Sequence, residues 1–223
     1  MNALRFALVP NAAFALSIFY CVGEADEPRQ EILGAPAAAL VNAGGESLLR
    51  YAIGCALPAQ ASFQVEDGTR FSGSLGIAPQ WTERALDPVE QRWITACLLA
   101  RTNLFGVHVM LSMRGPNAVL SGTVTAQEKT DYNFDEGAFY GDVWATPPHA
   151  YVCVGRGESA MKDRLKRVCT EESEAAGISR CGFEIAGKCE DVCDQQVADG
   201  SRLHCRGGGA TYDEVISIFL KPE

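Results

Sequence analysis

The stretch DPVEQRWITACLLARTNLFG (residues 87–106), followed directly by VHVMLSM (residues 107–113), decides the fold class. It predicts a helix, because Asp87 can accept the free N–H groups as N-cap, Pro88 suits the first helical position and Glu90 completes a capping box. The final glycine can end this helix. The next seven residues alternate with one wholly apolar face, which predicts a strand. Apolar side chains recur at helical spacing and predict the buried face of the helix: Val89, Trp93, Ile94, Cys97, Leu98 and Leu104.

Most other segments predict strands. Residues 48–57 are mostly apolar and stop at Pro58, while residues 62–66 and 70–77 flank a hairpin dipeptide, Asp-Gly, at 67–68. Further strands are expected at residues 119–127, 138–145, 150–154 and 214–220, and a second helix at 158–169. Since strands outnumber helices and the connections differ in length, we predict an α+β fold. In this fold we expect a largely antiparallel sheet that packs with one or two helices and carries a disulfide-rich C-terminal lobe.

Nine cysteines are the most informative count in the chain. Cys21 lies in an apolar N-terminal leader, and cleavage of the leader or lipidation on export leaves an even number. Eight cysteines can close four disulfides, which form in secreted and envelope proteins and are rare in the cytosol. The eight are Cys55, Cys97, Cys153, Cys169, Cys181, Cys189, Cys193 and Cys205.

The N-terminal residues predict export. Arg5 supplies a short positive region, residues 12–22 form a hydrophobic region, and the small residues Gly23 and Ala25 suit a cleavage site. The alternatives are lipidation at Cys21 and a core element of a cytosolic protein. No other stretch is long enough to span a bilayer. We therefore divide the chain into a signal peptide or leader (1–25), a flexible tether (26–47) and a single disulfide-stabilised α+β domain (48–223) with a cysteine-rich segment (169–205).

The pairing of these cysteines is not fixed by the sequence, because eight allow on the order of a hundred combinations. We expect Cys55 to pair with Cys97, and Cys153 with Cys169. A zinc site is the alternative for the late cysteines and a nearby histidine: Cys181, Cys189, Cys193, Cys205 and His204. Structural zinc sites usually bring their ligands in two close pairs, and this spacing has only one. Disulfides are the better interpretation, and we assign no metal site and no cofactor.

Composition limits the partners. Hydrophobic residues make up 47% of the 223 residues, which is ordinary for a globular domain with its own core. The formal net charge of −9 argues against nucleic acid and anionic membranes, since both require a basic surface.

An acidic segment at residues 131–137 contains oxygen ligands at alternate positions. Asp131, Asn133 and Asp135 alternate as in calcium loops, and Asp142 falls where a closing carboxylate would lie. The glycine of the segment comes one position late for an EF-hand turn. A calcium site is therefore the less favoured interpretation of this segment, and a polar loop that enters the next strand is the favoured one.

Three acids could supply catalytic chemistry. Glu128, Glu136 and Asp142 could contribute two carboxylates to one sheet face, and a separation of about 5 Å or roughly 6.5–9.5 Å would suit glycoside hydrolysis. The sequence contains no signature of a serine hydrolase, a zinc protease or a P-loop.

Aromatic residues concentrate beside these acids. Such a mixture suits a surface that binds carbohydrate or peptide. The predicted binding residues are Tyr132, Phe134, Glu136, Tyr140, Asp142 and Trp144.

Four stretches carry a resemblance: RYAIGCALP (50–58), GIAPQW (76–81), residues 91–115 and EGAFYGD (136–142). Together they resemble uncharacterised exported, cysteine-containing proteins of myxobacteria-like bacteria. The resemblance covers about residues 48–155 and implies an envelope or extracellular location. It supplies no activity, cofactor or catalytic residue.

We therefore expect a secreted, periplasmic or cell-envelope protein that acts as a non-catalytic binding or structural module for an unknown extracellular or envelope ligand. The alternative is a secreted hydrolase of glycans or peptides that uses Glu128, Glu136 or Asp142.

Overall fold

The computed structural model describes residues 46–65, 68–101, 109–156 and 184–222. Predictions for the leader, for nearly all of the tether and for a helix at 158–169 lie outside these residues, as do Cys21, Cys169 and Cys181. In the described part of the chain, no helix is long and apolar enough to cross a membrane.

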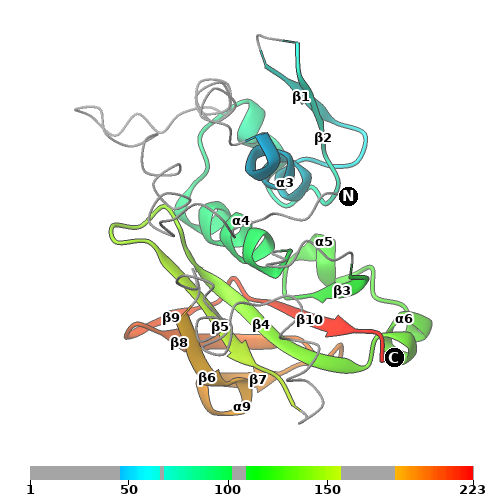
Figure 1. The fold of residues 1–223 in the computed structure, drawn as a ribbon, viewed down its shortest axis with the longest axis vertical. Helices are drawn as coiled ribbons and strands as arrows, with labels where there is room; N and C mark the ends of the chain where they lie inside the picture. The colour runs from blue at the N-terminus through cyan, green and yellow to red at the C-terminus, as the bar shows by residue number, and fades with distance from the viewer. Residues whose placement is uncertain (1–45, 66–67, 102–108, 157–183, 223) are drawn as a thin grey trace, which may run out of the picture.

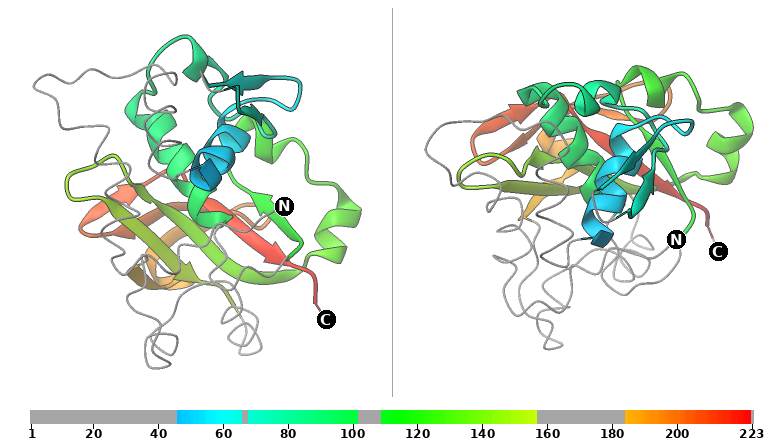
Figure 2. Two further views of the ribbon diagram at one scale, coloured as in Figure 1. Left: turned by 45° about the horizontal axis from the view of Figure 1, so that its top comes forward. Right: turned by 90° about the horizontal axis from the view of Figure 1, so that it is seen from above.

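The described residues form an α+β fold in three layers (Figure 1). The middle layer is a five-stranded sheet in the order β3 (Leu111–Arg114), β10 (Ile216–Leu220), β4 (Phe134–Asp142), β5 (His149–Val154) and β6 (Glu184–Lys188). Helix α4 (Pro88–Ala100) lies on one face, and α3 (Glu46–Ala56) packs against α4 on the same side of the sheet (Figure 1 and Figure 2). A three-stranded sheet of β7 (Cys193–Gln196), β8 (Arg202–Gly207) and β9 (Ala210–Tyr212) lies on the other, with the short helix α9 (Cys189–Val192).

The middle sheet is largely antiparallel, as predicted. Strand β10 pairs with β3 and β4 in antiparallel register, β4 pairs with β5 in the same way, and only β5 and β6 run parallel. The predictions for residues 138–145, 150–154 and 214–220 are confirmed as strands β4, β5 and β10, although β4 runs from Phe134 to Asp142 and β10 begins at Ile216.

Helix α4 has the predicted N-terminus. The Asp87 carboxylate accepts from the backbone N–H of Val89 and Glu90, both at 2.9 Å, and the Glu90 side chain accepts from Asp87 N–H at 3.0 Å. The helix ends at Ala100, six residues before the predicted stop, and Arg101 is its C-cap. Val89 was assigned to the buried face but is exposed, because it lies in the first turn, which extends beyond the core.

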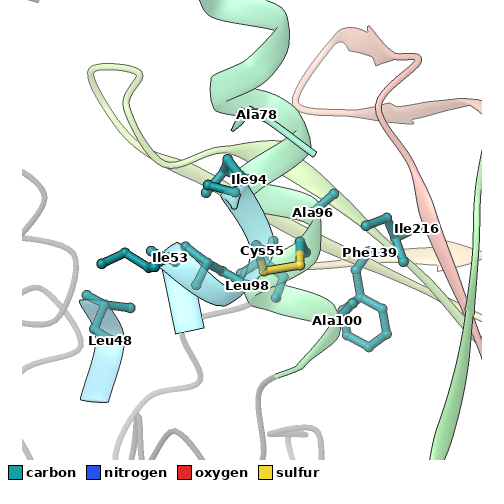
Figure 3. Close-up of a cluster of buried hydrophobic side chains, with 14 of the residues drawn as sticks. Leu48, Ile53, Cys55, Ala78, Ile94, Ala96, Leu98, Ala100, Phe139 and Ile216 are labelled. Atoms are coloured by element: carbon teal, nitrogen blue, oxygen red, sulfur yellow. A yellow bond between two sulfur atoms is a disulfide. The ribbon is translucent and has the colours of Figure 1, made fainter. Parts of the chain in front are cut away.

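Residues 48–57 were predicted to form a strand, and this prediction is wrong: residues 48–56 belong to helix α3, and Leu57 follows its last residue. An apolar run of this length fits either element, and burial decides between them. Leu49, Ile53 and Ala56 are buried at helical spacing, whereas Glu46 and Arg50 are exposed and form an ion pair one turn apart at 2.6 Å. A disulfide between Cys55 and Cys97, which confirms the predicted pair, joins α3 to α4 inside the core (Figure 3).

The strand predicted at residues 119–127 is also wrong. This region contains two short helices, α5 (Ala118–Ser121) and α6 (Ala126–Asp131). Their N-caps explain the difference, because the Asn117 side chain accepts from Val119 N–H and the Thr125 side chain from Glu128 N–H, both at 3.1 Å. Local capping outweighs the strand preference of the β-branched residues between them.

A small hairpin lies beside α3. Strands β1 (Ser62–Gln64) and β2 (Arg70–Ser72) pair antiparallel, and Gly68 has the positive φ of +92° that the predicted turn requires. The second strand ends five residues before its predicted limit. A 3₁₀ helix, η1 (Pro79–Thr82), then leads to α4.

Candidate functional site

The two faces of the middle sheet differ in chemistry. The face toward α3 and α4 is an apolar core that includes Phe139, Val152 and Ile218. The opposite face meets the three-stranded sheet and carries aromatic, sulfur and charged side chains. We call this region the inter-sheet layer, defined by Arg114, Asp135, Tyr140, Tyr151, Cys153, Cys189, Cys193, Arg202, Cys205 and Tyr212.

Two disulfides lie in the inter-sheet layer. Cys153 pairs with Cys189, which corrects the predicted Cys153–Cys169 bridge, and Cys193 pairs with Cys205. Strand register explains both. Parallel pairing of β5 with β6 places Val154 opposite Lys188, so that the next residue, Cys189, lies close to Cys153. Cys193 and Cys205 are direct partners across β7 and β8.

The sulfurs of the two bridges come together. Among the residues that the structure describes, the Sγ atoms of Cys153, Cys193 and Cys205 are the one group of potential metal ligands gathered within 4.8 Å of one another. All three sulfurs belong to disulfides, and so does Cys189. Bonded in this way they offer no thiolate to a metal, so the zinc alternative finds no ligands among these four sulfurs.

Three tyrosine rings lie next to the sulfurs. The ring centroids of Tyr140, Tyr151 and Tyr212 are 5.6–5.7 Å apart. The Tyr140 hydroxyl donates to the carbonyl of Arg206 at 2.9 Å. Burial raises the pKa of Tyr212 to about 12 and shifts the pKa of Tyr140 upward even further. Tyr140 was predicted to bind a ligand, but its side chain is fully buried and holds the two sheets together.

Charged groups fill the other end of the inter-sheet layer. Arg202 forms a buried ion pair with Asp135, and the Arg202 backbone N–H donates to the Ser217 hydroxyl at 2.9 Å. The Arg114 guanidinium stacks on the Phe219 ring, 3.8 Å from its centroid. It also donates to Ser112 Oγ at 3.0 Å and to two backbone carbonyls, those of Tyr132 at 2.6 Å and Asp199 at 2.8 Å. These contacts connect β3, the start of β4 and the β7–β8 turn.

Asp142 lies far from the other two predicted catalytic acids. Glu128 accepts from the Ser112 hydroxyl at 2.7 Å near the start of β4, whereas Asp142 ends that strand. Six residues of strand separate Glu136 from Asp142, which corresponds to about 20 Å. This exceeds the separation of about 5–9.5 Å that glycoside hydrolysis requires. Glu136 is only 1% exposed, so its side chain lies in the interior rather than on an exposed surface.

The predicted calcium ligands are also dispersed. Asp131 ends α6, where it accepts from Gln127 at 2.9 Å, and Asn133 is exposed. Asp135 is buried against an arginine, and Asp142 lies at the far end of β4. A calcium site needs six to eight oxygens around one point, and these side chains do not provide it.

The four remaining predicted binding residues divide between the two ends of β4. Tyr132 and Phe134 lie at its start, and Phe134 packs partly against the helix-side core. Asp142 and Trp144 lie at its end, both partly exposed. The Asp142 carboxylate accepts from Trp144 N–H at 2.9 Å, which fixes the turn that leaves the strand.

His149 joins Asp142 and Trp144 at this place and was not identified from the sequence. It is the strand partner of Asp142 at the start of β5. Its ring stacks on Tyr151, and its Nδ1 is 3.3 Å from the Tyr151 hydroxyl. The hairpin pairing of two consecutive strands would have revealed it, since the first residue of β5 faces the last of β4. We call Asp142, Trp144 and His149 the β4–β5 end.

The β4–β5 end is anchored to the helix layer. The backbone N–H of Val143 donates to the Thr95 hydroxyl of α4 at 3.2 Å. One helical turn earlier, Arg92 pairs with Glu214 at 2.7 Å through a bidentate contact, and this hydrogen bond raises the pKa of the guanidinium. The Val143 contact holds the turn on α4, and the Arg92–Glu214 pair holds α4 on the segment before β10, which favours a defined surface.

Comparison of the chain with protein-family models, with curated proteins and with solved structures gave no match.

Proposed function

We propose that the protein is an exported, disulfide-stabilised module that binds an extracellular or envelope ligand without changing it chemically. The observation that supports this most is the set of three disulfides among the described residues. They link α3 to α4, β5 to the start of α9, and β7 to β8. Covalent links between separate elements suit a protein that must persist outside the reducing cytosol.

The β4–β5 end is the proposed binding surface. At the rim of the middle sheet, Asp142 is paired with His149 across the two strands. Trp144 follows two residues later, with its ring packed partly against the helix-side core, and all three residues are partly exposed. Aromatic rings beside hydrogen-bonding groups suit the faces of sugar rings and the side chains of peptides. The acidic balance of the chain, with a net charge of −9, favours neutral or cationic ligands over anionic ones.

Arrays of glycans and peptides test this surface with the oxidised protein. We expect Asp142→Asn and Trp144→Ala to weaken binding at least tenfold, because each removes a group that would touch the ligand. Asn at position 142 can still accept from Trp144 N–H, so the turn is kept. Asp131→Asn is the matched control, since it changes an acid at the other end of β4 and should bind normally.

The same arrays distinguish a binding module from the alternative, a hydrolase. If the wild-type protein cleaves array members and one variant does not, the protein is an enzyme and a purely binding role is contradicted. The variants to compare are Glu128→Gln, Glu136→Gln and Asp142→Asn. If the wild-type protein binds no member of the arrays, that result would also contradict the proposed binding role.

A further inference from the structure

The two disulfides of the inter-sheet layer touch each other. The Sγ atoms of Cys153 and Cys193, which belong to different bridges, are 3.7 Å apart. We call the sulfurs of Cys153, Cys189, Cys193 and Cys205 the four-sulfur site. A separation of 3.7 Å is contact distance, so no other atom lies between the two bridges.

The scaffold holds this contact in place. Cys153 is on β5 of the middle sheet and Cys193 is on β7 of the three-stranded sheet, so the two sulfurs meet where the sheets face each other. All four cysteines are buried, and Cys193 is the most exposed at 7%. Packing therefore fixes the distance between the bridges.

We propose that the four-sulfur site is a thiol–disulfide exchange site in which one disulfide can move between sulfur pairs. The step begins from a state in which Cys193 is a free thiolate. Its Sγ attacks Cys153 Sγ, the Cys153–Cys189 bond breaks, a Cys153–Cys193 bond forms, and Cys189 leaves as a thiolate that takes up a proton. One disulfide is lost and one is gained, so the exchange itself consumes no oxidant or reductant.

In the wild-type protein an external dithiol supplies the starting state. It reduces Cys193–Cys205 to two thiols with two electrons and is itself oxidised to a disulfide. Exchange then leaves Cys153–Cys193 as the surviving bridge, with Cys189 and Cys205 free. The middle sheet stays covalently attached to the lobe through β7, while α9 is released from β5.

The third described disulfide lacks this arrangement. The described residues place no third cysteine sulfur beside Cys55–Cys97, whose neighbour is the Arg101 guanidinium, 3.8 Å from Cys55 Sγ. A free thiol at Cys55 therefore has no adjacent disulfide to attack. This bridge provides an internal control with the same burial and a different neighbourhood.

A Cys205→Ser variant tests the exchange without added reductant. It leaves Cys193 as a thiol beside Cys153–Cys189, and alkylation followed by peptide mapping identifies the free thiol. We expect Cys153–Cys193 as a major species with alkylated Cys189, appearing faster as the pH rises because the thiolate is the attacking form.

Two further experiments keep the proposal testable if the Cys205→Ser variant does not fold. Cys189→Ser leaves Cys153 beside the other bridge and should reach the same Cys153–Cys193 product from the opposite direction. Wild-type protein treated with a limiting amount of dithiothreitol should yield that product with no substitution present. The Cys97→Ser control should keep every other disulfide in its native pairing.

The proposal is overturned if the surviving bridges are native in all arms, with Cys193 alkylated in Cys205→Ser. Pairing of Cys193 with Cys169 or Cys181 would also overturn it, since this would be general scrambling. Loss of ligand binding is a separate matter and bears only on the proposed function.

Discussion

Replacing both Cys55 and Cys97 with alanine removes a cross-link between residues that are 42 apart in the sequence. A chain-entropy estimate for a loop of that size gives about 13 cal/mol/K, which corresponds to about 4 kcal/mol of unfolding free energy at 25 °C. The same relation gives about 3 kcal/mol for the loop of Cys193–Cys205, whose separation is 12. The order of the two losses is therefore set by loop length.

Denaturant unfolding of the oxidised proteins measures these losses directly. For a domain of this size, about 4 kcal/mol lowers the Tm by roughly 8–16 °C. The single variant Cys97→Ala lacks the same cross-link and should lose nearly as much, which separates loss of the bond from loss of the second side chain. A double variant within about 1 kcal/mol of the wild type would refute the reasoning, because the bond would then contribute little.

Two other predictions concern the inter-sheet layer. Asp135→Asn should destabilise the fold by about 3–5 kcal/mol, because it leaves the buried Arg202 charge without its partner, whereas Asp194→Asn breaks an exposed pair and should cost about 1 kcal/mol or less. Equal losses by urea unfolding would contradict this difference. Tyr140 and Tyr212 have raised pKa values because of burial, Tyr212 to about 12, while tyrosine in an unfolded chain ionises near about 10. Stability should be complete below about pH 10 and should fall as the pH rises toward about 12, because the unfolded chain then loses protons that the folded chain keeps. Phenolate absorbance and urea unfolding measured together test this, and ionisation of every tyrosine near pH 10 with no loss of stability would speak against it.

The sequence predicted elements well where a local signal had one meaning. The N-cap, proline and capping glutamate at residues 87–90 define the start of α4, and the β-branched and aromatic residues in the run at 150–154 favour β5. It failed for residues 48–57, since a short apolar run carries no period that separates helix from strand. It also failed for residues 119–127, where Asn117 and Thr125 act as caps.

The disulfides were likewise predictable only in part. Cys55–Cys97 could be predicted because each cysteine lies in a buried apolar element. Cys153–Cys189 could not, because it depends on parallel pairing of two strands, β5 and β6, that lie far apart in the chain. Long-range register of this kind leaves no mark on the local sequence.

The candidate binding residues were harder to predict from the sequence than the disulfides. Local composition gathered acids and aromatics at residues 132–144, but a strand of nine residues spreads them over its two faces and both of its ends. Tyr140 and Glu136 became part of the interior, and the residue that completes the β4–β5 end, His149, lies across the hairpin. A third layer covers the second sheet face, and the prediction of a disulfide-rich C-terminal lobe did not include which residues that lobe would bury.

The central claim is that the described cysteines are paired covalently in the native protein. Alkylation of the natively purified chain under denaturing, non-reducing conditions, followed by mass spectrometry of its peptides, tests it most directly. We predict no alkylated thiol at the six described cysteines, and cross-linked peptides that join Cys55 to Cys97, Cys153 to Cys189 and Cys193 to Cys205. Free thiols at these positions, or a metal ion that leaves with them on denaturation, would contradict the account.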